Sequence, residues 1–413
     1  MSNQDNSSTP RKNSANEGPL PSSPQSTKDS SSLTNSQIPY NRPPIVGKEL
    51  EYLQRALSQR KLCGDGPFTK LCHQWLVEQL QAQKALLTHS CTAALEMSAL
   101  LVNLSPGDEV IMPSFTFVST ANAVVLRGAT PVFVDVRSDT LNIDESLIEQ
   151  AITPKTKAIF VVHYAGVSCA MEAILEIANK HNIFVLEDAA QGIMATYKGR
   201  ALGTIGHLGS LSFHETKNIV AGEGGALLIN DPQFNERAEI IREKGTNRSQ
   251  FLRGEIDKYT WVDVGSSYLP SELIAAVLYA QLESASDITK QRLTLWNTYL
   301  SGLLDLQAKE KISLPHIPAE CEHNGHIFYL LTRTEEERSE LIPFLKNRGI
   351  HSVFHYVPLH LAPAGRRYAR SMNSLPVTSS SSDRLLRLPL YVGMSSDECQ
   401  RVVESIFDFY NER

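Results

Sequence analysis

Short apolar runs alternate with stretches of helical spacing along most of the chain after residue 38. The runs are Lys84–His89, Glu109–Pro113, Pro131–Val136, Lys157–His163 and Ile183–Asp188. Near-continuous apolar strands that alternate with helices predict an α/β fold, a mainly parallel sheet covered by helices on both faces. In such sheets the functional groups collect at the carboxyl ends of the strands.

Helical spacing also marks the regions on either side of this alternation. Gly47–Arg60 and Pro67–Gln81 precede it, with a tight glycine loop between them. A long helical pattern, Glu272–Leu306, leads out of the sheet. The pattern predicts a large α/β domain over residues 38–270, followed by a linking helix and a smaller α+β domain over residues 271–413.

The smaller domain has its own alternation of elements. We expect strands at His326–Thr332 and His351–Tyr356, with a helix at Glu336–Arg348 between them. The serine-rich stretch Ser374–Asp383 has the composition of a surface loop, and Ser395–Tyr410 has the spacing of a closing helix.

Residues 1–37 differ from the rest of the chain in composition. They are rich in Ser, Asn, Gln and Pro and contain no Phe, Tyr or Trp, so they cannot bury enough apolar surface to offset their chain entropy. We expect a disordered tail. No apolar segment follows the start, which excludes a signal peptide. A transit peptide is the weaker alternative, because the serine-rich tail carries Asp5, Glu17 and Asp29.

Overall composition is typical of a globular enzyme, with 42% hydrophobic and 20% charged residues. A net charge of −6 gives no reason to expect nucleic acid as a partner, and no apolar run approaches the roughly 20 residues of a membrane span. The 6 cysteines are scattered without metal-ligand spacing, so we expect reduced thiols, no metal and a cytoplasmic location.

One lysine stands in a glycine-rich return between two further apolar runs. Lys217 follows Leu208–Ser212, and the glycines of Gly222–Gly225 lead from it into Ala226–Asn230. Burial disfavours the charged ammonium, and a partly neutral amine can condense with a carbonyl. The stretch therefore indicates a Schiff-base lysine for pyridoxal phosphate. Taken alone, the lysine fits an ordinary hairpin with a surface side chain better.

Three other strand ends carry groups that suit a phosphate-bearing pyridine. After Lys84–His89, a helix begins near Cys91 and Thr92, and free amides at a helix start bind anions. Asp188 ends another run, where its carboxylate could pair with a pyridine nitrogen. Phe117 follows a third run and could stack on the ring. Simple helix capping by Ser90 or Thr92, a helix cap at Asp188 and a core location for the phenylalanines are the alternatives.

The order of these motifs resembles the DegT/DnrJ/EryC1/StrS sugar aminotransferases, pyridoxal-phosphate enzymes with the aspartate aminotransferase fold. The resemblance runs from about residue 38 to the carboxyl terminus. The motifs that carry it are Cys63–Thr69, Ser90–Ala94, Glu187–Gln191, Ser212–Asn218, Gly222–Gly225 and His355–His360. It implies a mainly parallel seven-stranded sheet, with pyridoxal 5′-phosphate as the cofactor.

The resemblance also implies a role for each matching residue. Lys217 would hold the cofactor covalently, and Asp188 would pair with its ring nitrogen. Gln191 would bond the ring hydroxyl, and Phe117 would stack on the ring. The phosphate would be held by the backbone amides of Cys91 and Thr92 and by the hydroxyl of Ser212.

Family members form homodimers in which a neighbouring subunit completes each active site. Many relatives have a Gly-x-Asn-x-Arg segment whose asparagine contacts the partner's phosphate. This chain has Gly265–Leu269 there, with Ser267 at the asparagine position and Leu269 in place of the arginine. The contact of Ser267 with the phosphate is therefore expected to be weaker or bridged by water.

Several stretches are most similar to the members of the family that aminate C4 of dTDP-4-keto-6-deoxy-D-glucose for enterobacterial common antigen. They are Lys61–Gly66, His214–Asn218, Glu243–Phe251 and Tyr259–Tyr268. L-Glutamate would be the amino donor, and a 3-keto or UDP-linked sugar is the alternative acceptor.

The basic residues Arg248, Arg253 and Lys258 could pair with the nucleotide's diphosphate, or they form a solvated loop. His355 is a further candidate for substrate binding.

Two other function classes fit the sequence less well. A dehydratase branch of the family has histidine at the lysine position, which Lys217 argues against. A protein that keeps the fold but only binds ligands has no need of Asp188, Gln191 and Lys217 together.

Overall fold

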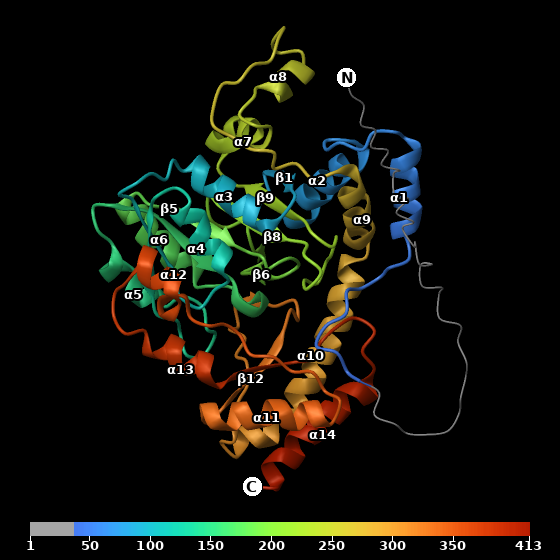
Figure 1. Ribbon diagram of the computed structural model, residues 1–413, viewed down its shortest axis with the longest axis vertical. Helices are drawn as coiled ribbons and strands as arrows, with labels where there is room; N and C mark the ends of the chain where they lie inside the picture. Colours follow the sequence, from blue (N-terminus) through green and yellow to red (C-terminus); the bar gives the residue numbers. More distant parts are fainter. Residues whose placement is uncertain (1–36) are drawn as a thin grey trace, which may run out of the picture. The chain divides into compact units, whose positions relative to one another are not determined.

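The computed structural model describes residues 37–413 (Figure 1). The tail expected over residues 1–37 lies, apart from Gln37, outside the described residues, and the domain boundary near residue 270 stays a prediction. None of the described helices is both long and apolar enough to cross a membrane.

The central sheet has eight strands in the order β1-β9-β8-β5-β4-β2-β3-β13. All neighbours are parallel except β9, which runs antiparallel to both β1 and β8. The strands are β1 Lys84–Thr88, β2 Glu109–Pro113, β3 Thr130–Val134, β4 Thr156–Val162, β5 Phe184–Asp188, β8 Leu208–Ser212, β9 Gly225–Ile229 and β13 Arg370–Ser371. The α/β fold and its mainly parallel sheet are thus confirmed.

The expected seven strands are present, and β13 extends the sheet by one. It contains two residues and pairs in parallel with β3 at the sheet edge. A two-residue strand leaves no apolar run in the sequence, and Arg370 occupies half of it. Its guanidinium forms an ion pair with Glu109 at 2.7 Å, which fixes this late segment against the sheet.

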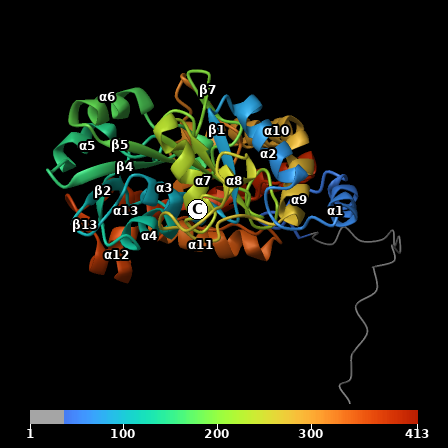
Figure 2. The ribbon, with the colours of Figure 1, turned by 90° about the horizontal axis from the view of Figure 1, so that it is seen from above.

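Helices cover both faces of the sheet (Figure 2). One face packs against α1 Glu49–Ser58, α2 Pro67–Leu80, α5 Glu145–Ala151, α6 Met171–His181 and α9 Glu272–Glu283. The other face packs against α3 Cys91–Leu101, α4 Val118–Val125 and α7 Asn235–Arg242. Because both faces are buried, the strands are apolar at successive positions, which is the pattern seen in the sequence.

The carboxyl-terminal part of the chain has a core of its own. A second, antiparallel sheet has the order β10-β12-β14, made of Ile312–Ser313, Phe328–Thr332 and Leu385–Leu388. It packs against α10 Ala285–Ala308, α11 Glu335–Asn347 and α14 Ser396–Asn411. The remaining short elements are β6 Thr196–Tyr197, β7 Arg200–Ala201, α8 Arg248–Leu252, β11 Cys321–Glu322, α12 Pro363–Tyr368, α13 Pro376–Arg384 and the 3-10 turns Tyr164–Gly166, Pro232–Phe234 and Leu359–Leu361.

The long helix expected over Glu272–Leu306 is two helices. Ser284 ends α9 and precedes α10, and its N–H donates to the carbonyl of Gln281 at 3.0 Å. Residues of α9 lie in the core of the main sheet, whereas Trp296 and Tyr299 of α10 lie in the carboxyl-terminal core. The chain passes from one core to the other along α10, whose first residues Ala285 and Ile288 still belong to the main core.

The prediction of a surface loop at Ser374–Asp383 is wrong, because most of this stretch forms α13. The Asp135 carboxylate, at the end of β3, accepts hydrogen bonds from the amides of Val377 and Thr378 at 3.0 and 2.8 Å. These are amides of the first helical turn, which need an acceptor from outside the helix. The cap is distant in sequence, so local composition gave no sign of the helix.

The prediction of a strand at His351–Tyr356 is also wrong. Only Val353 pairs, through an isolated bridge to Arg387 of β14. Most of the segment instead lines a cavity beside the main sheet, where its side chains face the opening rather than a neighbouring strand.

A buried carboxylate on α9 fixes the start of α2. Glu272 accepts from the amides of Gly66, Phe68 and Thr69 at 2.8 to 3.1 Å and is 1% exposed. We expect Glu272→Gln to lower the free energy of unfolding by about 2 kcal/mol, because an amide N–H then faces backbone N–H groups. Chemical denaturation measures this. The exposed Glu78→Gln on α2 should change it by less than about 0.5 kcal/mol, and equal effects would contradict the capping role.

Candidate active site

A cavity of about 750 Å³ lies at the carboxyl ends of the main-sheet strands, closed on one side by the carboxyl-terminal part of the chain. Strand ends contribute Val162, Asp188 and Ser212, and the starts of α3 and α4 contribute Cys91 and Phe117. The opposite wall is formed by Tyr40, Arg292, His326, His355, Tyr356 and Arg387.

Lys217 lies in the loop between β8 and β9, as the sequence predicts, and its half-buried side chain lines the cavity. The loop is closed by hydrogen bonds that join Phe213 to Gly224 and Ala221 at 2.9 and 2.8 Å. Burial lowers the pKa of Lys217, and the neighbouring Cys91 and Asp188 oppose this shift. The amine is therefore not a surface lysine of an ordinary hairpin.

Asp188 ends β5 and is 5% exposed. One carboxylate oxygen accepts from the Thr120 hydroxyl at 2.6 Å, and the other accepts from the Ala190 amide at 3.1 Å. Burial raises the pKa of Asp188, against the effect of these two donors and of Lys217. Turns follow Asp188 rather than a helix, so it is not a helix cap. A buried carboxylate in this state is suited to a cationic partner.

The start of α3 offers amide groups to the cavity. The Ser90 hydroxyl caps the helix by accepting from the Ala93 amide at 3.1 Å, as the capping alternative expects. The amides of Cys91 and Thr92 belong to the first turn and have no carbonyl within the helix to bond. Both residues line the cavity, beside Ser212 at the end of β8. Capping and anion binding are thus compatible here.

A glycine lets β9 pass close to this helix start. A Cβ atom at Gly225 would lie 2.4 Å from the carbonyl carbon of Ser90 and 2.5 Å from the nitrogen of Cys91. Any larger residue would displace the two amides, so the close contact of strand and helix determines where an anion can bind.

The two phenylalanines that follow β2, Phe115 and Phe117, lie in different environments. Phe115 is buried and packs against Tyr164, whereas Phe117 is 58% exposed and lines the cavity. Gln191 also lines it, with its carbonyl oxygen accepting from the Ala165 amide at 2.7 Å and its amide donating to the Tyr356 hydroxyl at 3.1 Å.

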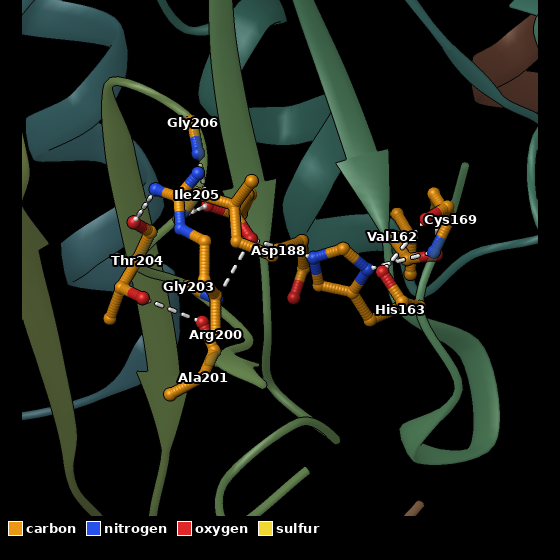
Figure 3. A network of polar contacts seen from close by, with 12 residues as sticks. Val162, His163, Cys169, Asp188, Arg200, Ala201, Gly203, Thr204, Ile205 and Gly206 are labelled. Atoms are coloured by element: carbon orange, nitrogen blue, oxygen red, sulfur yellow. Dashed lines mark hydrogen bonds and ion pairs between the residues drawn. The ribbon is translucent and has the colours of Figure 1, made fainter. Parts of the chain in front are cut away.

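Sequence reasoning missed a buried network behind Asp188 (Figure 3). The Glu187 carboxylate accepts from the amides of three residues of the following turn at 2.5 to 2.8 Å, namely Gly203, Ile205 and Gly206. It also accepts from Nε2 of His163 at 2.8 Å, while Nδ1 of His163 accepts from the Cys169 amide at 3.2 Å. The His163 amide donates to the Asp188 carbonyl at 3.2 Å. The sequence did contain one signal of this network, which is the position of a glutamate, Glu187, inside an otherwise apolar strand.

Other expected site residues lie elsewhere in the chain. Ser267 is exposed, Arg248 forms an ion pair with Glu243 at 2.8 Å, and neither they nor Lys258 line the cavity of their own chain. His355 does line it, with Nδ1 3.0 Å from the Tyr164 hydroxyl. Burial lowers the pKa of His355 well below its usual value, helped by Arg387 and Lys217, so the ring is neutral.

The donor set fits a phosphorylated pyridine aldehyde. A half-buried amine, a buried carboxylate across from it and two free helix amides line one cavity, and no group of three or more metal-ligating side chains occurs in residues 37–413. When bound, pyridoxal phosphate supplies an electron sink for proton removal at a neighbouring carbon. Fold and site together define a pyridoxal-phosphate enzyme of the aspartate aminotransferase class.

Comparison with known proteins identifies the family. The sequence model of the DegT/DnrJ/EryC1/StrS aminotransferase family matches residues 43–407, so the chain belongs to this family of sugar aminotransferases. It is 33% identical to the spore coat polysaccharide biosynthesis protein SpsC of Bacillus subtilis (strain 168), covering 91% of this chain and 97% of the relative. It is also 33% identical to GDP-perosamine synthase of Escherichia coli O157:H7, covering 91% and 99%.

Solved structures agree with this assignment. Spr1654 from Streptococcus pneumoniae, described as a sugar aminotransferase, superposes with a TM-score of 0.84 in its PMP form at 27% identity. The alignment covers 91% of this chain and 98% of that one. Spr1654 has also been solved in a PLP form. Pyridoxal 5′-phosphate is accordingly the cofactor of this chain.

Proposed function

We propose that this protein transfers the amino group of L-glutamate to C4 of a nucleotide-linked keto sugar, with dTDP-4-keto-6-deoxy-D-glucose as the first candidate. The product would be dTDP-4-amino-4,6-dideoxy-D-galactose, a precursor of surface polysaccharide. The carrying observation is the cavity that brings Lys217 and Asp188 together. A relative named for spore coat polysaccharide synthesis and another named for GDP-perosamine support an amino sugar as product.

The chain's own residues have separable tasks in this reaction. Lys217, whose pKa burial lowers, can accept a proton from the substrate carbon and return it to the cofactor side. Asp188 would keep the ring nitrogen of a bound cofactor protonated, and the Thr120 hydroxyl and Ala190 amide hold that carboxylate in place. The network around Glu187 fixes the end of β5, and Phe117 covers one side of the cavity.

The acceptor sugar is tested with purified protein, L-glutamate and a panel of 3-keto and 4-keto sugars linked to dTDP, UDP or GDP. Mass spectrometry detects the amine, and NMR assigns the carbon and its configuration. The proposal expects the dTDP-linked 4-keto sugar to give the highest kcat/KM. Preference for a 3-keto sugar, or for a UDP- or GDP-linked one, would reject this substrate and leave an aminotransferase for another nucleotide sugar.

We further propose that the active protein is a homodimer whose subunits complete each other's sites. Residues 243–268 form a segment that we call the arm, which contains α8 and extends beyond α7, away from α11 and α14 (Figure 1). The arm exposes large apolar side chains, with Trp261 at 78% and Leu252 at 64% exposure. Exposed apolar side chains that gather on one segment favour contact with another protein surface.

Mixed dimers test the shared site and the role of the arm's cations. Arg248→Ala with Lys258→Ala should weaken nucleotide-sugar binding while leaving the glutamate half-reaction nearly unchanged. These subunits, mixed with Lys217→Ala subunits and allowed to exchange, should recover about a quarter of wild-type activity, because half of the dimers then have one intact site. Activity is measured before and after exchange. An absence of recovery despite hybrid formation, or turnover by a monomer, would contradict the proposal.

A further inference from the structure

Two histidines line the cavity from the carboxyl-terminal part of the chain, and each uses only one ring nitrogen within the protein. His326 lies just before β12, and His355 lies in the segment that was expected to form a strand. Nδ1 of His326 is 2.9 Å from Oδ1 of Asn218. Nδ1 of His355 is 3.0 Å from the Tyr164 hydroxyl. Within residues 37–413, Nε2 of neither ring has a hydrogen-bond partner.

A histidine that is satisfied within this protein looks different. Both nitrogens of the buried His163 are bonded, Nε2 to the Glu187 carboxylate and Nδ1 to the Cys169 amide. His326 and His355 each keep one nitrogen free although their rings line a cavity. A polar atom that loses its water when a ligand fills the cavity needs a new partner from that ligand. The two free nitrogens therefore point to polar groups on a bound molecule.

The hydrogen bonds around Asn218 determine which nitrogen of His326 carries the proton. Nδ2 of Asn218 donates to the Asn324 carbonyl at 3.0 Å, so Oδ1 of Asn218 is left as an acceptor. Nδ1 of His326 must therefore donate to that oxygen. Burial lowers the pKa of His326 well below its usual value, helped by Lys217 and Arg292, so the ring carries a single proton. Nε2 of His326 consequently has a lone pair and can only accept.

Tyr164 gives His355 the opposite tautomer. Tyr164 is fully buried, and burial raises the pKa of its hydroxyl well above the usual value, so the hydroxyl keeps its proton. In residues 37–413 that hydroxyl has no hydrogen-bond partner besides Nδ1 of His355, and it therefore donates to this nitrogen. The neutral ring of His355 then has its own proton on Nε2. This nitrogen can only donate.

The cavity thus contains one neutral acceptor and one neutral donor near Lys217. Burial lowers the pKa of both rings, and the charge of Lys217 adds to the effect on each, which places both histidines near the reactive amine. An alcohol suits this pair, because its O–H donates and its oxygen accepts. A carboxylate does not, because it has no proton to offer to the lone pair of His326. The pair therefore fits a hydroxyl group and not an acid.

We propose that His326 and His355 bind the hydroxyl group next to the carbonyl carbon of the acceptor sugar. The hydroxyl donates to Nε2 of His326 and accepts from Nε2 of His355, and Tyr164 is the positioning residue that fixes this donor. The inference rests on the proposed function, because it assigns a site to the sugar of that reaction. In dTDP-4-keto-6-deoxy-D-glucose the group is the C3 hydroxyl, whereas L-glutamate has no hydroxyl. The ligand class is keto sugars with a free hydroxyl beside the carbonyl.

The test compares wild type, Tyr164→Phe and the control Tyr329→Phe in the cofactor-loaded protein. Tyr164→Phe keeps the ring and removes the hydroxyl that fixes the proton of His355. Tyr329 is equally buried and packs against Tyr164 with ring centres 5.8 Å apart, but within residues 37–413 its hydroxyl bonds no histidine. Each protein is assayed with dTDP-4-keto-6-deoxy-D-glucose and with its 3-deoxy analogue.

The ratio of kcat/KM for the two sugars is the readout. Wild type and Tyr329→Phe should prefer the hydroxylated sugar by about 100-fold, because the analogue leaves both nitrogens unpaired. The preference should fall to about 10-fold in Tyr164→Phe, where the proton of His355 is no longer fixed. His326→Phe, which removes the acceptor, should show a similar fall. A full preference in Tyr164→Phe, or a loss for glutamate as large as that for the sugar, would overturn the assignment.

Equilibrium binding separates this inference from the proposed function. The probes are dTDP-6-deoxy-D-galactose, which has no carbonyl to react, and its 3-deoxy counterpart. Calorimetry should show that wild type binds the first about 100-fold more tightly and Tyr164→Phe only about 10-fold, with near-UV circular dichroism confirming intact folding. If wild type aminates no keto sugar, the transamination proposal fails. Equal affinity of wild type for the two probes overturns the hydroxyl site whether or not wild type transaminates.

Discussion

Lys217→Ala is expected to abolish turnover while leaving the protein folded and able to bind pyridoxal phosphate reversibly. The variant keeps Asp188 and the α3 amides, which would hold the two ends of the cofactor, but it has no amine for covalent attachment and proton transfer. Activity should fall by roughly 10⁶-fold, the order seen when a covalent catalytic group is removed. The visible absorption of the covalently attached cofactor should disappear as well.

The measurements are steady-state turnover, the absorption spectrum and cofactor retention on gel filtration. Lys309→Ala is the control, because Lys309 forms an exposed ion pair with Asp305 at 2.7 Å and does not line the cavity. The control should behave as wild type. Near wild-type turnover of Lys217→Ala would end the assignment of Lys217 as the attachment site.

Asp188→Asn is expected to lower turnover by about 10²- to 10³-fold with little change in folding. Asparagine can still accept from the Ala190 amide, but it carries no charge to keep a proton on the pyridine nitrogen, so the cofactor loses strength as an electron sink. Single-turnover kinetics with glutamate isolate this chemical step. Asp231→Asn, a half-buried cap of the turn Pro232–Phe234 that lies outside the cavity, is the matched control and should leave turnover unchanged.

The pH dependence gives a second measure of Asp188. Burial raises its pKa, so the carboxylate charge is present above that raised pKa and is lost as the pH falls through it. The cofactor affinity of the cofactor-free wild type should therefore fall on acidification, and that of Asp188→Asn should show no such step. A variant with wild-type turnover and the same acid step would make Asp188 a structural group only.

Elements that follow from local patterns were predicted well. Strands β1 to β5 and β9 are buried and appear in the sequence as near-continuous apolar runs, whereas the equally buried β8 alternates leucine with glycine and serine. Elements set by distant contacts were not predicted. Helix α13 depends on a cap from Asp135, more than two hundred residues earlier, and β13 exists because Arg370 reaches Glu109.

The candidate site likewise contains some residues that the sequence predicted and others that it did not. Lys217, Asp188 and the start of α3 stand at strand ends, which parallel topology brings to one edge, and the structure places them in one cavity. Apart from His355, the opposite wall escaped prediction, because Tyr40, Arg292 and Arg387 come from three remote segments with no shared motif. The roles of the cavity residues, and of the arm residues that lie outside it, remain predictions for the variants described above.

The glycine motif after Lys217 limits evolutionary change in two unrelated ways. Gly222 has open space around it, but its φ of +79° is a left-handed conformation, so a drifting sequence could accept asparagine or aspartate there at modest cost. Gly225 has an unremarkable backbone and no free volume, because the start of α3 touches it. No side chain can be accommodated there without moving Ser90 and Cys91 at the start of α3, where the phosphate is predicted to bind. Among related sequences, other residues at the position of Gly222 would therefore reflect tolerance of its backbone conformation. An invariant glycine at the position of Gly225 would reflect cofactor use.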